Sequence, residues 1–304
     1  MMNTVPAHPA TVLGIRPTVS VGLIPALFVC LSAPAFFVVR LPWLGWALLA
    51  AGMLVAWLVR GRTDAEAEAA RASAPAPPEG AATRTPSLVR DLSLIALGLL
   101  IVSAIDLAAE LDNLAFLRFT LALGGAVAVP YVVSRFVYRD YAIRFPWRGG
   151  GRWTRFQWSW LAAVLILGWL ILPFYFITSG VYMNWPVVNT PELIARLFVG
   201  VGAVGIWDEL FFICTVFTLL RRHFPDWQAN LLQAIVFVSF LWELGYQAWG
   251  PLLTIPFALV QAYIFKRTRS LTYVVTVHLL FDAVVFLVLV HAHNPGLLDG
   301  LFLV

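Results

Sequence analysis

The sequence has little charge and almost no cysteine, and each shortage excludes a class of protein. Only 12% of its 304 residues are charged, whereas soluble domains carry about 25%. This low charge argues against an ordinary soluble enzyme. The two cysteines, Cys30 and Cys214, lie in apolar segments and form no CxxC pair, which argues against a disulfide framework and indicates buried thiols.

Apolar residues fill the rest of the chain. Hydrophobic residues make up 61% of it, with 22 Phe and 13 Trp. A membrane-spanning helix needs about 20 mostly apolar residues. The sequence therefore predicts an all-α, polytopic membrane helical bundle of about eight to nine transmembrane helices, the first two forming a tight hairpin and 251–265 being short enough to be re-entrant. The expected spans are 20–39, 41–59, 92–110, 114–133, 158–179, 193–220, 228–249, 251–265 and 271–292.

Two polar stretches interrupt the apolar runs. Residues 60–91 are rich in Ala, Pro and mixed charge, which predicts a flexible linker with at most a short helix in DAEAEAARA. Residues 134–157 carry six Arg and one acid, which is typical of a cytoplasmic loop; a patch for anionic lipid headgroups is the alternative. The expected regions are 1–59 (tail and first hairpin), 60–91 (linker), 92–180 (helices with the basic loop) and 181–304 (membrane core).

The distribution of basic residues predicts the orientation. Arg and Lys gather in loops that fall on one side of the expected spans, so they report topology rather than nucleic-acid binding. We expect a multi-pass protein of the inner (plasma) membrane with a cytoplasmic amino terminus. Arg40 is the one basic residue against this layout. The first twenty residues lack a basic start followed by an apolar core, so we expect no cleavable signal peptide.

Titratable residues inside the expected spans are the candidate functional residues. Burying an Asp in a span costs at least about 2.5–3.5 kcal/mol, so such residues are retained for a reason. His278 and Asp282 are four residues apart and therefore share one helix face. Asp208 and Glu209 are adjacent and point about 100° apart. The full set is Asp106, Asp208, Glu209, Glu243, His278 and Asp282. Asp106 stands alone in its span, so we expect a bond to a neighbouring helix and no catalytic role for it.

Acids and a histidine converging from three helices allow two chemistries. A carboxylate can deprotonate a water while histidine stabilises the oxyanion that forms when this water attacks an amide. Alternatively, these groups can ligate a divalent metal. The signatures HExxH and GxSxG are both absent, so neither a zincin nor an α/β-hydrolase is indicated.

Three segments resemble the CAAX-processing and bacteriocin-processing (CPBP, ABI) family of glutamic-type intramembrane proteases. These segments are DELFFIC, SFLWELG and VHLLFD. The family pattern is EExxxR, then FxxxH, then HxxxN or HxxxD. The resemblance covers about 195–292 and implies an endopeptidase that acts on a peptide or protein substrate in the membrane, with lipid-modified substrates included. No cofactor is assigned, and a divalent metal stays open.

The resemblance also assigns candidate catalytic residues. It implies that Asp208 and Glu209 stand at the two glutamates, that Asp208 activates water together with the residue at the middle histidine, and that His278 and Asp282 form the oxyanion site. Glu243 stands at the middle histidine in the register we prefer. In the alternative register, Phe240 to Leu244, this segment supplies no polar group to the site.

Departures from the family pattern keep other functions open. Ile213 replaces the motif arginine, which leaves four carboxylates near one histidine, and at close range they cannot all ionise without compensation. We expect either a bound divalent metal or protons shared among Asp208, Glu243 and Asp282. A non-catalytic relative that binds a membrane partner, or a proton-coupled carrier, is the alternative function; no nucleic-acid partner is expected.

Overall fold

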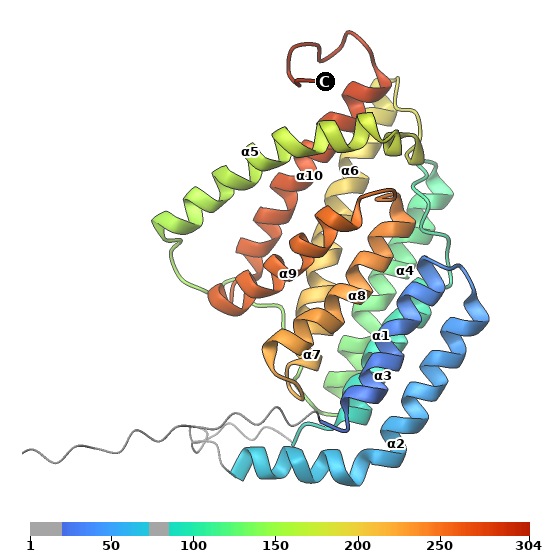
Figure 1. The fold of residues 1–304 in the computed structure, drawn as a ribbon, viewed down its shortest axis with the longest axis vertical. Helices are drawn as coiled ribbons and strands as arrows, with labels where there is room; N and C mark the ends of the chain where they lie inside the picture. Colours follow the sequence, from blue (N-terminus) through green and yellow to red (C-terminus); the bar gives the residue numbers. More distant parts are fainter. Residues whose placement is uncertain (1–19, 73–84) are drawn as a thin grey trace, which may run out of the picture.

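The computed structural model describes residues 20–72 and 85–304, and these residues form a bundle of helices (Figure 1). The elements are α1 (Leu23–Phe37), α2 (Pro42–Ala72), α3 (Leu88–Val102), α4 (Asn113–Val132), η1 (Val133–Val137), α5 (Arg155–Thr178), η2 (Val181–Asn184), α6 (Pro191–Asp208), η3 (Glu209–Phe217), α7 (Thr218–Leu220), α8 (Asp226–Leu244), α9 (Pro251–Thr268) and α10 (Leu271–His293).

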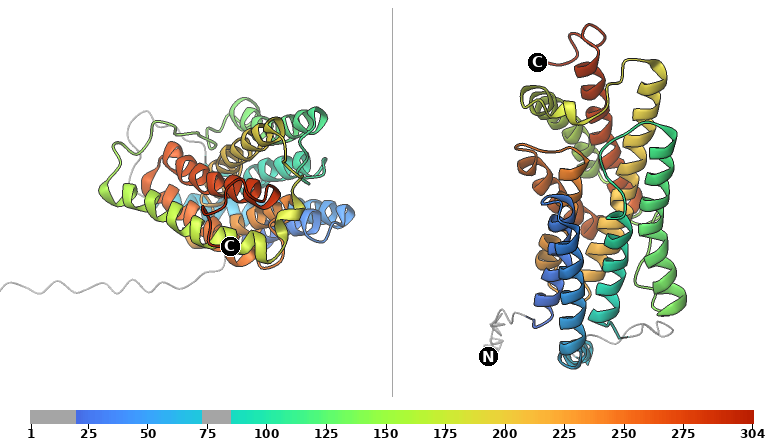
Figure 2. Two further views of the ribbon diagram at one scale, coloured as in Figure 1. Left: turned by 90° about the horizontal axis from the view of Figure 1, so that it is seen from above. Right: turned by 90° about the vertical axis from the view of Figure 1, so that its right-hand side faces the viewer.

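Most helices run side by side along the long axis, and α5 crosses them at an angle (Figures 1 and 2). Helix α10 packs against α5 on one side and α6 on the other, while α8 packs against α1 and α9. Five helical stretches are long and apolar enough to cross a membrane among the described residues. The predicted all-α membrane bundle is therefore confirmed.

Helix α6 continues without a break into η3 and α7, and this run carries Asp208 and Glu209. The run begins at Thr190, whose hydroxyl accepts a hydrogen bond from the Leu193 amide, with Pro191 in the first turn. Within it, nine residues from Glu209 adopt π-helical geometry. The Thr215 and Thr218 hydroxyls donate to carbonyls five residues earlier, which matches the wider π-helical turn.

The structure corrects two boundaries. Helix α2 extends to Ala72, so the short helix expected in DAEAEAARA is present as the end of α2, and residues 60–63 are helical rather than part of the predicted linker; the Ala, Glu and Arg residues of this stretch have high helix propensity. The second half of α2 runs across one end of the bundle (Figure 1). The part of the predicted linker at 73–84 lies outside the described residues.

The predicted span 92–110 also ends too late. Helix α3 stops at Val102, and the Asp106 carboxylate accepts a hydrogen bond from the Ala108 amide in an exposed turn. An Asp side chain that bonds its own backbone two residues on competes with helix formation. Asp106 is therefore not a buried intramembrane acid.

Candidate active site

The α6–η3 junction and the middle of α10 bring four predicted site residues together. Asp208, Glu209, His278 and Asp282 are all buried. Asp208 ends the α-helical part of the run, and Glu209 begins the π-helical part. Single π-turns inserted in α-helices are frequent at functional sites because they change the direction in which neighbouring side chains point.

His278 lies at the centre of this group. Its Nδ1 lies 2.8 Å from Glu209 Oε1, at hydrogen-bond distance. Its Nε2 lies 3.5 Å from Asp208 Oδ2 and 3.8 Å from Asp282 Oδ1, which is too far for a strong bond to either. Glu209 therefore fixes one edge of the ring and leaves the other edge open between two carboxyl groups.

Gln261 of α9 completes the site and was not predicted from the sequence. Its fully buried side-chain amide donates to Glu209 Oε1 at 2.7 Å and to the Val274 carbonyl at 3.1 Å. Glu209 Oε1 thus meets both the Gln261 amide and the His278 ring. The available signal was a lone amide residue inside the apolar run 251–265, because polar groups in spans need partners.

A glycine lets α6 approach the α10 carboxyl group closely. A Cβ atom on Gly205 would collide with Asp282 Oδ2, and it would also lie 3.3 Å from the His278 ring. Gly205 stands three residues before Asp208, on the same face of α6. The close contact between the two helices therefore requires glycine at this position.

Asp208, His278 and Asp282 open into a cavity of about 340 Å³ between α4, α6, α8 and α10. Its walls are largely apolar, and the Phe257 ring packs edge-on against His278 with a centroid distance of 4.9 Å. Glu209 is not among the lining residues. An apolar cavity with a few convergent polar groups is the usual form of a small-molecule or peptide site.

The wall contributed by α8 carries no charge. Leu241 and Leu244 line the cavity, together with Tyr246 beyond the helix end. Glu243 does not join the cluster; it lies half-buried near Asp106 and the Leu107 backbone. Because neighbouring residues on a helix point about 100° apart, a helix that presents Leu241 and Leu244 turns Glu243 elsewhere.

The described residues of the candidate active site form no preformed set of metal ligands. In residues 20–72 and 85–304, no group of three or more His, Cys, Asp or Glu side chains is arranged to hold a metal ion. Sharing of protons with Glu243, the other expectation, loses its geometric basis because Glu243 lies elsewhere.

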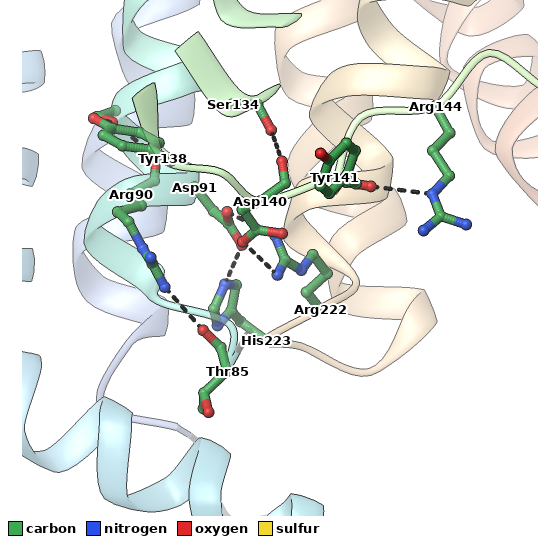
Figure 3. Close-up of polar contacts among 11 residues, drawn as sticks. Thr85, Arg90, Asp91, Ser134, Tyr138, Asp140, Tyr141, Arg144, Arg222 and His223 are labelled. Atoms are coloured by element: carbon green, nitrogen blue, oxygen red, sulfur yellow. Dashed lines mark hydrogen bonds and ion pairs between the residues drawn. The ribbon is translucent and has the colours of Figure 1, made fainter. Parts of the chain in front are cut away.

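A second polar cluster lies at the end of the bundle beside the turn after α7 (Figure 3). Arg222 forms ion pairs with Asp91 of α3 at 3.0 Å and with Asp140 at 2.8 Å. His223 Nε2 lies 2.7 Å from the other Asp91 oxygen. His223 follows directly after α7, where a side chain is easily solvated, but its side chain is only 8% exposed.

Comparison with known proteins identifies one segment of the chain. Residues 189–284 match the family described as type II CAAX prenyl endopeptidase Rce1-like. This segment is Rce1-like. The match contains all four clustered residues together with Gln261, and it confirms the predicted resemblance of this segment to the CAAX-processing protease family. Neither a curated protein nor a solved structure matches the chain.

Proposed function

We propose that the protein is an intramembrane endopeptidase that hydrolyses a peptide bond in a membrane-associated or lipid-modified protein. The observation that carries the proposal is the imidazole of His278, held at Nδ1 by Glu209 while Nε2 faces a cavity between two carboxyl groups. The Rce1-like match supports this activity at the level of the family, and its description points to prenylated CAAX segments as one substrate class.

The proposed reaction uses the open edge of the ring. Asp208 takes a proton from a water whose oxygen attacks the peptide carbonyl carbon. The His278 imidazolium, bonded to Glu209, donates through Nε2–H to the oxyanion that forms. Asp282 flanks the same edge and, as a protonated acid, adds a second donor. The proton on Asp208 then passes to the leaving amine, which completes hydrolysis.

Glu209 and Gln261 are positioning residues in this scheme. Glu209 fixes the imidazole in the same way that a buried carboxylate orients the base of a hydrolytic triad. Gln261 holds Glu209 Oε1 in place from α9. Glu243 has no part in the proposed reaction.

The test compares protein termini in membranes of cells that express matched levels of four variants. These are the wild type, His278→Ala, Asp208→Asn and the control Asp106→Asn, which changes an acid outside the cluster. We expect new termini in the wild type and the control that vanish in the other two. These termini would also reveal the substrate.

Identical termini in all four strains, with each protein folded and abundant, would overturn the proposal. The non-catalytic relative would then be favoured if partner capture persisted in His278→Ala. Loss of function in Asp106→Asn would favour the carrier, because a proton path would draw on acids beyond the cluster.

A further inference from the structure

The basic loop 134–157 has no part in the proposed reaction, and its second half lies against the turn between α9 and α10. The Pro146 carbonyl accepts a hydrogen bond from the Leu271 amide at 3.1 Å. The Trp147 carbonyl accepts another from the Thr272 hydroxyl. The loop is therefore bonded to the start of α10, and the two segments form one continuous surface.

Two glycines bring the loop and the turn into backbone contact. A Cβ atom on Gly149 would collide with the Arg269 carbonyl oxygen, and one on Gly150 would lie 2.5 Å from the Thr268 carbonyl oxygen. Gly150 also has a φ of +82°, which glycine adopts without strain. Arg148 is therefore one residue away from a direct backbone contact with Arg269.

Four arginines on these two segments form what we call the arginine cluster. All four are exposed, and within the described part of the chain none of them forms an ion pair. No acidic residue occurs at 141–191 or at 244–281, so neither segment carries its own counter-charge. Like charges gathered in this way repel one another, and a bound anion relieves the repulsion. The members are Arg148, Arg152, Arg267 and Arg269.

The surroundings of the arginine cluster are those of a membrane interface. The loop precedes α5 and the turn precedes α10, and both helices are long and apolar enough to cross a membrane. Trp147 is 46% exposed beside Arg148, and Tyr263 is 57% exposed one turn before Arg267 on α9. Exposed Trp and Tyr side chains collect at the level of the lipid headgroups. The cluster therefore presents its charge where headgroups lie.

The occupant that fits these properties is an anionic phospholipid. Its phosphate offers oxygens that a guanidinium binds with two parallel hydrogen bonds, and its acyl chains stay in the bilayer. A free anion in solution would gain nothing from the exposed aromatic rings. We propose that the arginine cluster binds the headgroup phosphate of an anionic phospholipid, with Trp147 and Tyr263 packed beside the glycerol region. The binding is separate from the proposed peptidase activity.

The test is native mass spectrometry of the full-length protein released from a neutral detergent, titrated with phosphatidylglycerol or phosphatidylcholine. Inorganic phosphate serves as the competitor that represents a free anion. The cluster variant combines Arg148→Gln with Arg267→Gln and leaves Arg269, whose φ is +51°, in place. The control combines Arg60→Gln with Arg62→Gln, which removes the same charge from two exposed residues of α2.

We expect the wild type and the control to bind phosphatidylglycerol about tenfold more tightly than phosphatidylcholine. In the cluster variant, binding of phosphatidylglycerol should weaken about 25-fold, about fivefold for each arginine, while binding of phosphatidylcholine stays unchanged and shows that the protein is folded. Equal binding of the two lipids by the wild type, or equal losses in the two double variants, would overturn the proposal. Displacement of phosphatidylglycerol by an equal concentration of inorganic phosphate would also overturn it, because the site would then bind a free anion.

Discussion

His278 of α10 and Glu209 of η3 are joined through Nδ1 and Oε1 at 2.8 Å, across 69 residues of sequence. Both side chains are almost completely buried. A hydrogen bond to a charged group contributes about 1.5–3 kcal/mol, and a partner left alone in a buried site costs more. The pair therefore couples the position of the π-helical segment to the orientation of the proposed catalytic ring.

Replacing Glu209 with Gln tests this coupling. Both the Gln261 amide and the His278 ring meet the same oxygen, Oε1, so a glutamine oxygen can keep these two contacts, but the negative charge that supports a His278 imidazolium is lost. We expect cleavage of the identified substrate to fall about 10²–10³-fold, since an imidazole without this counter-charge is a weaker donor to the oxyanion. Quantification of substrate termini measures this.

The matched control for that variant is Glu192→Gln on α6. Glu192 pairs with Arg196 four residues on, and its side chain is 75% exposed. The Glu192→Gln variant should therefore cleave the substrate as the wild type does. A Glu209→Gln protein with wild-type cleavage would show that the ring does not depend on this carboxylate.

Enlarging Gly205 tests the close approach between α6 and α10. The added methyl group of Gly205→Ala must displace Asp282, and overpacking of this kind costs about 1–3 kcal/mol. We expect a lower midpoint of thermal unfolding in detergent and a loss of cleavage.

Gly202→Ala is the control, one turn earlier on α6. A Cβ there would lie 3.9 Å from Leu279, in ordinary contact, so the alanine fits and its higher helix propensity applies. If both alanine variants unfolded at the wild-type temperature and kept wild-type cleavage, Asp282 would not need its present position.

The sequence predicted the bundle well because hydropathy and length alone define membrane helices. It also predicted that His278 and Asp282 share a face, since four-residue spacing on a helix is a local property. Glu243 shows where local reasoning stops. Its rotation about α8 is set by the packing of Leu241 and Leu244 on the cavity, and a sequence register cannot reveal that.

Gln261 and His223 were missed for a related reason. Each has partners far away in the chain: Glu209 for Gln261, and Asp91 for His223. The π-helical segment that begins at Glu209 was not predicted either, because no residue spacing in the sequence indicates it. Contacts between segments that are far apart in the sequence can be identified only in the folded bundle.

Treatment with a chelator tests the metal alternative. We expect cleavage to survive incubation with EDTA and gel filtration, because no metal-binding group of three His, Cys, Asp or Glu side chains is found in the described part of the chain. Elemental analysis of the active protein should find less than one equivalent of any divalent metal. Loss of cleavage that Zn²⁺ or Mg²⁺ restores would contradict the proposed carboxylate mechanism.

The ionic cluster of Figure 3 should contribute strongly to stability. In Arg222→Gln, two largely buried carboxylates, Asp91 and Asp140, lose their cation. Removing one partner of a buried ion pair costs about 3–5 kcal/mol. The free energy of unfolding in a denaturing detergent titration measures the loss.

Arg118→Gln provides the comparison. Arg118 pairs with Glu110, and the two side chains are 46% and 53% exposed, so the expected cost is about 0–1 kcal/mol. Equal losses in the two variants would mean that the cluster at Arg222 is solvated and contributes no more than a surface pair.

Acid should weaken the contact between the start of α8 and the end of α9. A hydrogen bond from Lys266, reinforced by Arg221 at 3.2 Å, holds the pKa of Asp226 below its ordinary value. Its unfolded pKa is about 3.9, so the stabilisation is fully present above that pH and is lost as the pH falls below it through the folded pKa.

Asp226→Asn lacks this titrating group. Thermal unfolding measured from pH 6 to pH 3 should therefore show the wild type losing stability more steeply than the variant below about pH 4. Parallel curves would mean that Asp226 titrates alike in the folded and unfolded chains, and that its ion pairs add nothing to the fold.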